Sequence, residues 1–532
     1  MPYNLIEEAW IPIRRADGTT GRIAPWQITD GYSDTARRVV ALQSPRPDFD
    51  GALVQFLIGL AQTCIAPRDN AEWRKMLKNP PAPETLHEAF APVAHAFNFD
   101  GDGPRFMQDL QLRETDDKPL SISALLMDAP GEQTEKLNKD HFIKRGSVHS
   151  MCYSCTATAL FALQTNAPSG GQGHRTSLRG GGPLTTILYG EDLWATMVFN
   201  LLCSEEFDRL SGNATLTSMH HRFPWLAPTR TSEKDTGMET TTRDCHPLQM
   251  YWAMPRRIRL LLSAPSQGTC PVCGYSGVLC SYYVAKNYGI NYSGAWQHPL
   301  SPYGRNKENE PFALHPNEDT ITYRHWVAFV FGDETSKIAP ATVIQKFRTR
   351  MLAPPPCRIA AFGFETDNMK VRAWHYALQP YLAVPSEHEP AFCALARQLR
   401  DAAVNVAKWL SDAIKEALCD PRRDASLDAI LFQPVHTTFW HDTEPHYYSA
   451  LAHIAAGEDA LPIKEQWCSL LQQAARAVFD SRANAPDMTV SNIKRLVTAR
   501  NKLLKLTAGR KLRESILQLP PLTPRKKRRQ NE

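Results

Sequence analysis

The stretch MCYSCTATALFALQTNAPSGGQG, residues 151–173, joins three patterns in one short segment. It begins with a C-x-x-C pair, Cys152 and Cys155, continues as an apolar run typical of a buried helix, and ends in a turn rich in Pro and Gly. We therefore expect a pair of metal-binding thiols at the start of a core helix that leads into a flexible loop.

A second C-x-x-C pair, Cys270 and Cys273, lies far along the chain in TCPVCGYSG. The spacing lets two thiolates of one turn reach a tetrahedral metal ion at about 2.3 Å, and two such turns supply four sulfur ligands. Four thiolates leave no open coordination position, so the sequence predicts one structural Zn2+ per chain and not a catalytic ion. Cys280 is a reserve ligand, and two unrelated thiol pairs or a redox pair are the alternative.

The loop itself continues as SGGQGHRTSLRGGG, residues 169–182. A phosphate-binding P-loop needs a Lys followed by Ser or Thr, and no Lys occurs here. The dinucleotide fingerprint also fails, because Thr176 stands where its third Gly belongs. What remains is either an irregular surface loop or a flexible loop bearing His174, Arg175 and Arg179 whose backbone can approach a ligand closely.

Composition narrows the class of protein. The chain has 532 residues, of which 43% are hydrophobic, enough for two to four domains. Its net charge of +5, from 60 basic and 55 acidic residues, is too balanced to indicate nucleic-acid binding by itself.

The start, MPYNLIEEAW, is acidic where a signal peptide is basic, and the apolar run 53–65 is shorter than the ~20 residues of a membrane span. We expect a cytoplasmic protein with no membrane partner.

The character of the sequence changes at AVPSEHEP, residues 383–390. Before it, strand-like runs (TTILYG, IRLLL, WVAFVFG) alternate with helical patterns and many Pro- and Gly-rich connections. After it come four amphipathic stretches, at residues 391–418, 446–456, 463–479 and 490–512. The sequence predicts an α+β fold with an irregular mixed body and zinc site in 1–384, a four-helix bundle in 385–520 and a disordered basic tail in 521–532.

The last predicted helix has a basic stripe opposite its apolar side. The stripe consists of Lys494, Arg495, Lys502 and Lys505, and no acid occurs between Lys494 and Arg513. This pattern favours contact with phosphate groups, and a merely solvated face is the alternative.

A search for a catalytic centre finds one crowded stretch, HTTFWHDTEPH. It contains His436, His441, Asp442, Glu444 and His446, but no hydrolase or nuclease motif frames them. We interpret these residues as polar packing, and they justify no catalytic assignment. A metal-dependent hydrolase centred on His436–His446 is one alternative function, and a zinc-stapled interaction protein without DNA contact is another.

Several stretches, spread along nearly the whole chain, resemble the sequences of one protein family and occur in the same order as in that family. They are NLIEEAWIPI (4–13), IGLAQTCIAP (58–67), CYSCTATALF to LRGGGPLTT (152–186), the second cysteine pair, WQHPLSP (296–302), GFETDNMKVRAW (363–374) and TARNKLLKL (498–506). Together they resemble the CasA family, the large subunit of the type I-E CRISPR surveillance complex called Cascade.

The resemblance implies a subunit without catalytic activity. It implies recognition of the protospacer-adjacent motif (PAM) in double-stranded DNA from the minor groove, opening of the duplex for guide-RNA pairing, and recruitment of the separate Cas helicase-nuclease. The partners would be target DNA, the 5′ end of the CRISPR guide RNA and the other Cascade subunits. The zinc ligands of the family fall on the same four cysteines.

The family's recognition elements can be assigned by position. The glycine loop falls on Ser169, Gly170, Gly171, Gln172 and Gly173, the lysine finger on Lys286, the wedge on Asp367, Asn368 and Met369, and a loop that docks near the guide RNA on Phe142 and Ile143. Three positions depart from the family pattern: Gln172 replaces a glycine, Asn368 a glutamine and Lys144 an asparagine.

Overall fold

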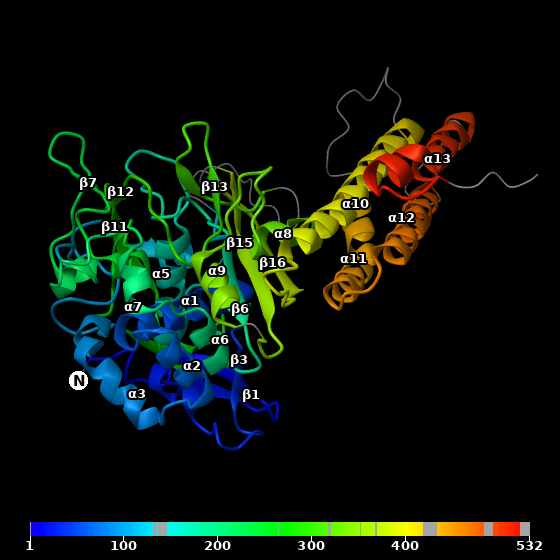
Figure 1. The fold of residues 1–532 in the computed structure, drawn as a ribbon. Helices are drawn as coiled ribbons and strands as arrows, with labels where there is room; N and C mark the ends of the chain where they lie inside the picture. The colour runs from blue at the N-terminus through cyan, green and yellow to red at the C-terminus, as the bar shows by residue number, and fades with distance from the viewer. Residues whose placement is uncertain are drawn as a thin grey trace, which may run out of the picture. The chain divides into compact units, whose positions relative to one another are not determined.

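The computed structural model describes residues 2–130, 136, 146–263, 265–317, 321–351, 353–367, 370–418, 433–483 and 493–521. The chain divides into two compact units, Met1–Asp319 with Ala328–Tyr381, and Thr320–Val327 with Leu382–Glu532. The first mixes helices and strands and the second is helical (Figure 1). The predicted combination of a mixed body with a C-terminal helical region is confirmed.

The first unit begins with a small antiparallel sheet followed by a central helix. The sheet has the order β2-β1-β3 and consists of β1 (Ile11–Arg15), β2 (Thr20–Ile23) and β3 (Val39–Leu42). Helix α1 (Pro47–Cys64) is buried on every side from Gly51 to Gln62, which explains its uniformly apolar sequence. Among the described residues, no helix is both long and apolar enough to cross a membrane.

An aromatic cluster around α1 forms the core of this unit. The ring of Phe56 lies 5.2 to 5.9 Å from those of Trp10, Phe97, Phe106, Phe161 and Trp252. These rings come from α1, from α5 (Tyr153–Asn166), from the 3-10 helix Ala91–Phe97 and from connections between elements. Large aromatic side chains that bury much apolar area can thus stabilise a unit whose strands are mostly short.

The remaining strands among the described residues form five small sheets, with the orders β5-β10-β9, β4-β11-β8, β12-β7, β13-β14 and β16-β15-β6. The strands are β4 (Leu120–Ser121), β5 (Met151–Cys152), β6 (Thr185–Tyr189), β7 (Glu239–Thr240), β8 (Arg257–Leu260), β9 (Ser266–Thr269), β10 (Ser276–Cys280), β11 (Tyr282–Lys286), β12 (Asn291–Tyr292), β13 (Tyr303–Arg305), β14 (Pro311–Ala313), β15 (Arg358–Asp367) and β16 (Lys370–Pro380). The other helices are α2 (Asn70–Lys78), α3 (Pro83–Phe90), α6 (Leu193–Phe199), α7 (Ser204–Asp208), α8 (Trp326–Val330) and α9 (Thr342–Arg350).

One predicted strand is wrong. The run WVAFVFG is helical at its start, in α8, although its residues have strand propensity. Trp326 and Val327 are fully buried, and a 3-10 turn (Tyr323–His325) leads directly into the helix. Tertiary burial here outweighs local propensity.

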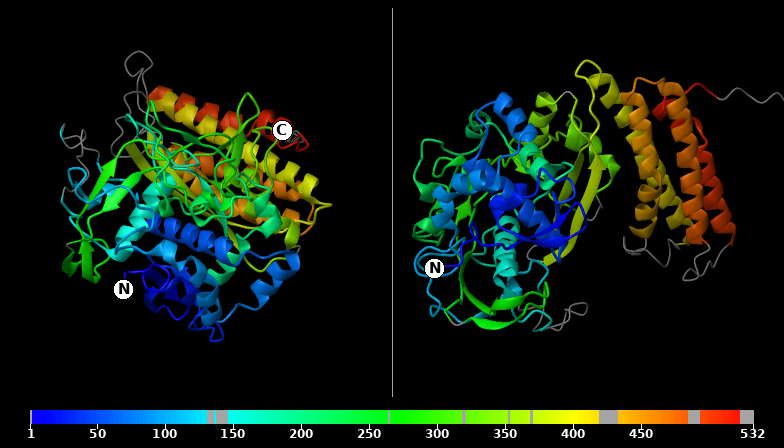
Figure 2. Two further views of the ribbon diagram at one scale, coloured as in Figure 1. Left: turned by 90° about the vertical axis from the view of Figure 1, so that its left-hand side faces the viewer. Right: turned by 90° about the horizontal axis from the view of Figure 1, so that it is seen from below.

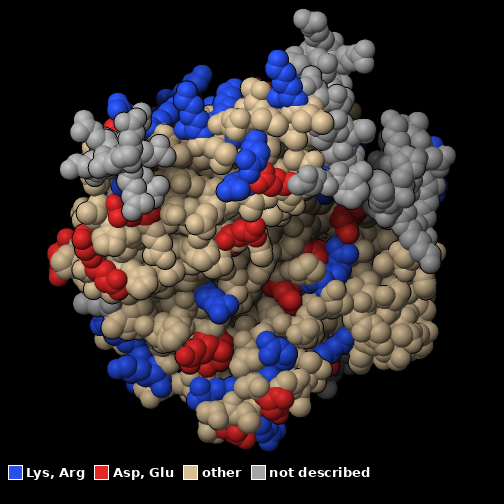
Figure 3. Space-filling model, turned by 90° about the vertical axis from the view of Figure 1, so that its right-hand side faces the viewer, with Lys and Arg blue, Asp and Glu red and all other residues tan. Residues whose placement is uncertain are grey.

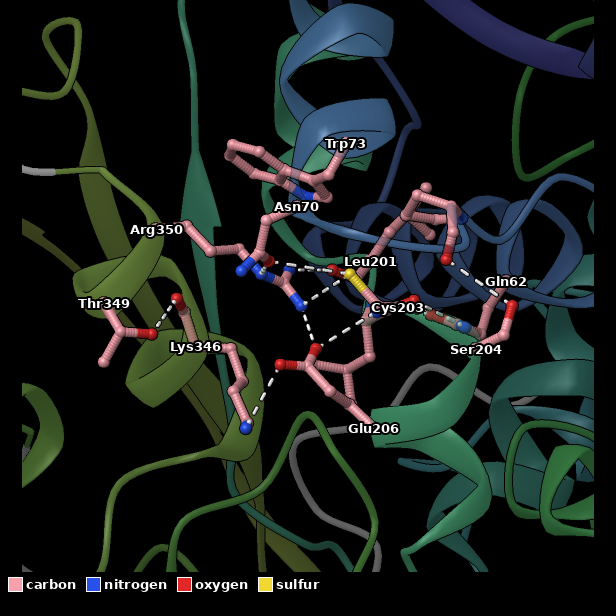
Figure 4. A network of polar contacts seen from close by, with 12 residues as sticks. Gln62, Asn70, Trp73, Leu201, Cys203, Ser204, Glu206, Lys346, Thr349 and Arg350 are labelled. Atoms are coloured by element: carbon pink, nitrogen blue, oxygen red, sulfur yellow. Dashed lines mark hydrogen bonds and ion pairs between the residues drawn. The ribbon is translucent and has the colours of Figure 1, made fainter.

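A buried guanidinium joins three helices of the first unit (Figure 4). Arg350 of α9 donates to Oδ1 of Asn70 in α2 at 2.8 Å and pairs with the carboxylate of Glu206 in α7. Glu206 also accepts an ion pair from Lys346 at 3.1 Å. Because a buried charge is costly unless it is paired, these contacts fix the relative positions of the three short helices.

In the described part of the second unit, four long helices pack against one another (Figure 2). They are α10 (Glu389–Leu418), α11 (Gln433–Ala455), α12 (Ala460–Ala483) and α13 (Ile493–Thr507), and a π-helical turn (Lys511–Ile516) follows α13. Helix α11 begins well before the predicted start at residue 446 and contains Pro445. Burial of Phe439, Trp440 and Tyr447 offsets the backbone hydrogen bond that the proline removes.

Candidate metal centre and nucleic-acid interface

Two strand ladders bring the distant cysteine pairs together. Strand β10 pairs with β9 on one side and with β5 on the other, where Leu279 lies opposite Cys152. Cys152 caps the N-terminus of α5, and Cys155 lies in the first turn of that helix. Cys270 and Cys273 occupy the turn between β9 and β10, which Gly274 closes with a positive φ of 73°.

The four cysteines fit a tetrahedral ion. All four Sγ atoms lie within 4.8 Å of one another, and those of Cys152 and Cys273 are 3.5 Å apart. A tetrahedral zinc ion with bonds of 2.3 Å holds its sulfurs about 3.8 Å apart. In the described part of the chain this is the one convergent set of three or more His, Cys, Asp or Glu side chains. Cys280 lies outside it.

The electrostatics of the cluster suit a cation. Hydrogen bonding with Cys152 raises the pKa of Cys155, which favours its protonated thiol, and hydrogen bonding with Cys152 lowers the pKa of Cys273 to about 6. A divalent ion would displace these protons, because only thiolates ligate metals. The positive end of the α5 dipole also stabilises negative charge on Cys152 and Cys155.

A basic side chain from the first sheet completes the surroundings of the cluster. The guanidinium of Arg22 in β2 donates to Sγ of Cys273 at 3.3 Å and approaches Sγ of Cys152 at 3.9 Å. It also lies 4.0 Å from the ring centroid of Tyr275. A cluster of four thiolates and one divalent ion keeps two negative charges, which Arg22 partly offsets.

The first half of the glycine stretch packs on the turn after β11. The N–H of Tyr288 donates to the carbonyl of Gly173 at 2.8 Å, and Nδ2 of Asn287 donates to the carbonyl of Gln172 at 2.9 Å. The side chain of Gln172 donates to Oη of Tyr288 at 3.0 Å. A Cβ on Gly173 would lie 2.8 Å from that of Asn287, so only glycine allows this approach.

Lys286 lies at the end of β11, directly before that turn. It pairs in register with Arg257 of β8, and its side chain is exposed. Gly171 and Gln172 are also exposed, so the loop and the lysine present adjoining polar surface. The structure thus brings together two elements that are far apart in the sequence.

The second half of the glycine stretch packs on the β15–β16 hairpin. Gly182 has a φ of 63°, and a Cβ there would lie 2.3 Å from the carbonyl oxygen of Phe364. Thr366 donates to the carbonyl of Gly181 at 3.5 Å, beside the register shift between Glu365 and Thr366. One glycine-rich stretch therefore contacts both the Lys286 turn and the hairpin.

Of the predicted wedge, the structure describes only Asp367. Asp367 ends β15 and forms an ion pair with Arg372 of β16 at 2.7 Å. Asn368 and Met369 lie outside the described residues, as do Phe142 and Ile143 of the predicted guide-RNA loop.

The basic stripe of α13 is only partly available. Lys502 forms an ion pair with Glu416 of α10 at 2.7 Å, and Arg495 donates to the carbonyl of Ala417 at 3.3 Å. Lys494 and Lys505 are exposed. On the face drawn in Figure 3, Lys and Arg side chains lie both along the upper edge and over the lower part, where Asp and Glu side chains lie among them.

The cluster His436 to His446 does not converge. His436 contacts Oγ of Ser411 at 2.8 Å, while the side chain of His441 is 83% exposed beside Asp442. The residues lie along α11 at spacings that place them on different faces. This arrangement gives the hydrolase alternative no metal site among the described residues.

Comparisons with known proteins identify the class. A family model of the CRISPR-associated protein Cse1 matches residues 4–478, and the chain belongs to this family. The fold is similar to that of Thermobifida fusca Cse1 (TM-score 0.72, 16% identity, 97% of this chain and 98% of that chain). It is also similar to Cse1 from Acidimicrobium ferrooxidans (0.70, 17%, 97% and 99%). A third similar chain comes from a structure described as a CRISPR RNA-guided surveillance complex (0.68, 16%, 96% and 100%).

Sequence reasoning missed the residues that support the glycine loop. Asn287 and Tyr288 follow Lys286 directly, yet nothing in their pattern indicated contact with residues 172 and 173. Tyr288 has a φ of 62°, a strained conformation for an aromatic residue and one that clusters at functional sites. Gly289, which follows Tyr288, was the one feature of the sequence that indicated a tight turn here.

Proposed function

We propose that this chain is the large subunit of a type I-E Cascade complex and reads the PAM of double-stranded target DNA. The observation that carries the proposal is the contact between the glycine loop and the turn after Lys286. Family membership and the similarity to a chain of an RNA-guided surveillance complex support the assignment to such an assembly.

The geometry suits reading from the minor groove. That groove presents a nearly degenerate pattern of acceptors, so recognition depends on close approach and a few donors. Gly170, Gly171 and Gly173 offer backbone N–H groups without side chains, and Lys286 offers a cationic donor next to the turn that contacts this loop. The protein would read only a short motif, and weakly. Base pairing with the guide RNA would then supply the rest of the sequence specificity.

The hairpin would open the duplex next to the motif. The assigned wedge, residues 367–369, would insert beside a base step, at a cost of a few kcal/mol for unstacking. Packing of Gly182 against Phe364 joins the hairpin to the motif-reading loop, so reading and opening would occur at one place. The exposed Lys494 and Lys505 would contact the phosphates of flanking DNA.

The other assigned roles belong to the same proposal. The four cysteines would hold one structural zinc ion that fixes the start of α5 and the β9–β10 turn. Phe142 and Ile143 would dock near the 5′ end of the guide RNA. The chain would itself have no catalytic activity and would help recruit the separate Cas helicase-nuclease.

Replacement of Lys286 tests the proposal. In the reconstituted complex, Lys286→Ala should weaken binding of a motif-bearing duplex roughly 10-fold or more, because a base-edge donor is lost. Binding to a duplex with a scrambled motif should change little. Both affinities are measured by titration at one fixed salt concentration, since phosphate contacts depend strongly on salt.

Lys307→Ala is the matched control, because Lys307 is an exposed lysine in the turn between β13 and β14. It should leave both affinities unchanged. Equal effects of the two substitutions would show that Lys286 supplies only general charge.

A further inference from the structure

We propose that Arg256 is a positioning residue that fixes the shape of the glycine loop by bridging its two ends. Nη2 of Arg256 donates to the carbonyl of Pro168 at 2.6 Å, and Nη1 lies 2.5 Å from Nδ1 of His174. These two acceptors flank residues 169–173. One guanidinium thus closes the loop at its base. The functional consequence rests on the proposed function, whereas the structural one does not.

Arg256 is itself held by α5. The backbone N–H of Arg256 donates to Oε1 of Gln164 at 2.9 Å, and Nε2 of Gln164 donates to the backbone carbonyl of Arg256 at 2.9 Å. Gln164 is completely buried in the helix that begins at the cysteine cluster. On the other side, a Cβ on Gly289 would lie 2.0 Å from the carbonyl oxygen of Pro255, so the chain after Tyr288 packs directly on this backbone.

The charge states suit the bridge. Burial lowers the pKa of Arg256 to about 10, which leaves the guanidinium charged at neutral pH. Burial and the nearby charge of Arg256 lower the pKa of His174, so its imidazole is neutral and Nδ1 can accept. The neighbouring Arg257 pairs instead with Asp109 at 2.6 Å. Arg256 thus directs its donors to the loop, and Arg257 directs its own to the core.

The planar fork of arginine explains the residue type. It can donate to two acceptors in fixed directions, whereas a lysine ammonium is a point charge on a flexible stem. Glycines have wide conformational freedom, so without a closed base residues 169–173 would sample many shapes. A binding surface made of backbone N–H groups gains affinity and selectivity when it is held in one shape before binding.

Hydrogen exchange on the isolated full chain tests the bridge without any DNA. In Arg256→Gln, amides of a peptide covering residues 168–177 should exchange about 10-fold faster or more, because local opening becomes easier. Peptides from α5 should be unchanged. Arg259→Gln, which removes a charge three residues further along, in β8 and near Arg105, Glu114 and Asp109, should leave the loop peptide unchanged. Unaltered exchange of the loop in Arg256→Gln would overturn the proposal.

Binding by the reconstituted complex tests the functional consequence. Arg256→Gln should reduce the preference for a motif-bearing over a scrambled duplex by about 10-fold, with little change for the scrambled duplex. Equal weakening for both duplexes would reduce Arg256 to a source of general charge. If Arg256→Gln keeps the normal preference for the motif-bearing duplex while Lys286→Ala loses it, the inference about Arg256 is wrong and the proposed function still stands.

A wild-type complex without any motif preference would refute the proposed function, and the exchange experiment would still decide the role of Arg256. If Arg256→Gln fails to fold, His174→Ala removes one of the two acceptors and should accelerate exchange at residues 172–177. No acceleration there would equally contradict the bridge.

Discussion

Cys270→Ser should abolish stoichiometric zinc binding and lower the free energy of unfolding by several kcal/mol. A structural zinc ion contributes about 10 kcal/mol or more in small zinc-dependent folds, and removal of one thiolate leaves an incomplete site. The cluster joins the start of α5 to the β9–β10 turn, so both elements should loosen. Metal analysis of the purified chain and a chemical denaturation curve measure the two effects.

Cys280→Ser is the control for this prediction. Cys280 is buried in β10 but lies outside the four-sulfur cluster, so its variant should retain about one zinc ion per chain. A wild-type chain without zinc, or a Cys270→Ser variant that still binds one equivalent, would contradict the assignment of the metal centre.

Tyr323→Ala should destabilise the helical unit by about 3 to 5 kcal/mol, the usual cost of truncating a buried aromatic residue. Tyr323 is fully buried, its ring stacks on that of Tyr447 at 4.4 Å, and its hydroxyl contacts Oγ1 of Thr443 at 2.8 Å. Hydrogen exchange of peptides from α11 and α12 should therefore accelerate strongly.

Tyr323→Phe separates packing from hydrogen bonding. It keeps the stacked ring and leaves Thr443 bonded to the carbonyl of Phe439 at 2.7 Å, so it should cost only about 1 kcal/mol. Similar exchange in Tyr323→Ala and the wild type would show that residues 320–327 are not an integral part of the helical unit.

The cysteine pairs show what spacing alone can predict. C-x-x-C fixes the geometry of one turn, and two such turns need only a strand pairing to meet, which β10 provides. Arg22 gave no comparable signal, because its approach to Cys273 depends on how β2 packs. The proximity of residues 172–173 to 287–288 likewise depends on long-range packing that no local pattern encodes.

The helical unit shows a second limit. The amphipathic period predicted four helices, but it placed the start of α11 at residue 446, whereas the helix begins at Gln433 and contains Pro445. Burial of the aromatic residues before the proline decides that boundary. The inclusion of Thr320–Val327 in this unit could not be predicted either, because a short segment far from the helices carries no periodic signal.

The most direct test of the central claim is a selection among duplexes with randomised base pairs beside a guide-matched target. The reconstituted complex containing this chain should enrich a short motif immediately next to the target, and Lys286→Ala should flatten that enrichment. Enrichment of every flanking sequence to the same degree by the wild-type complex would contradict the claim that the glycine loop and Lys286 read DNA.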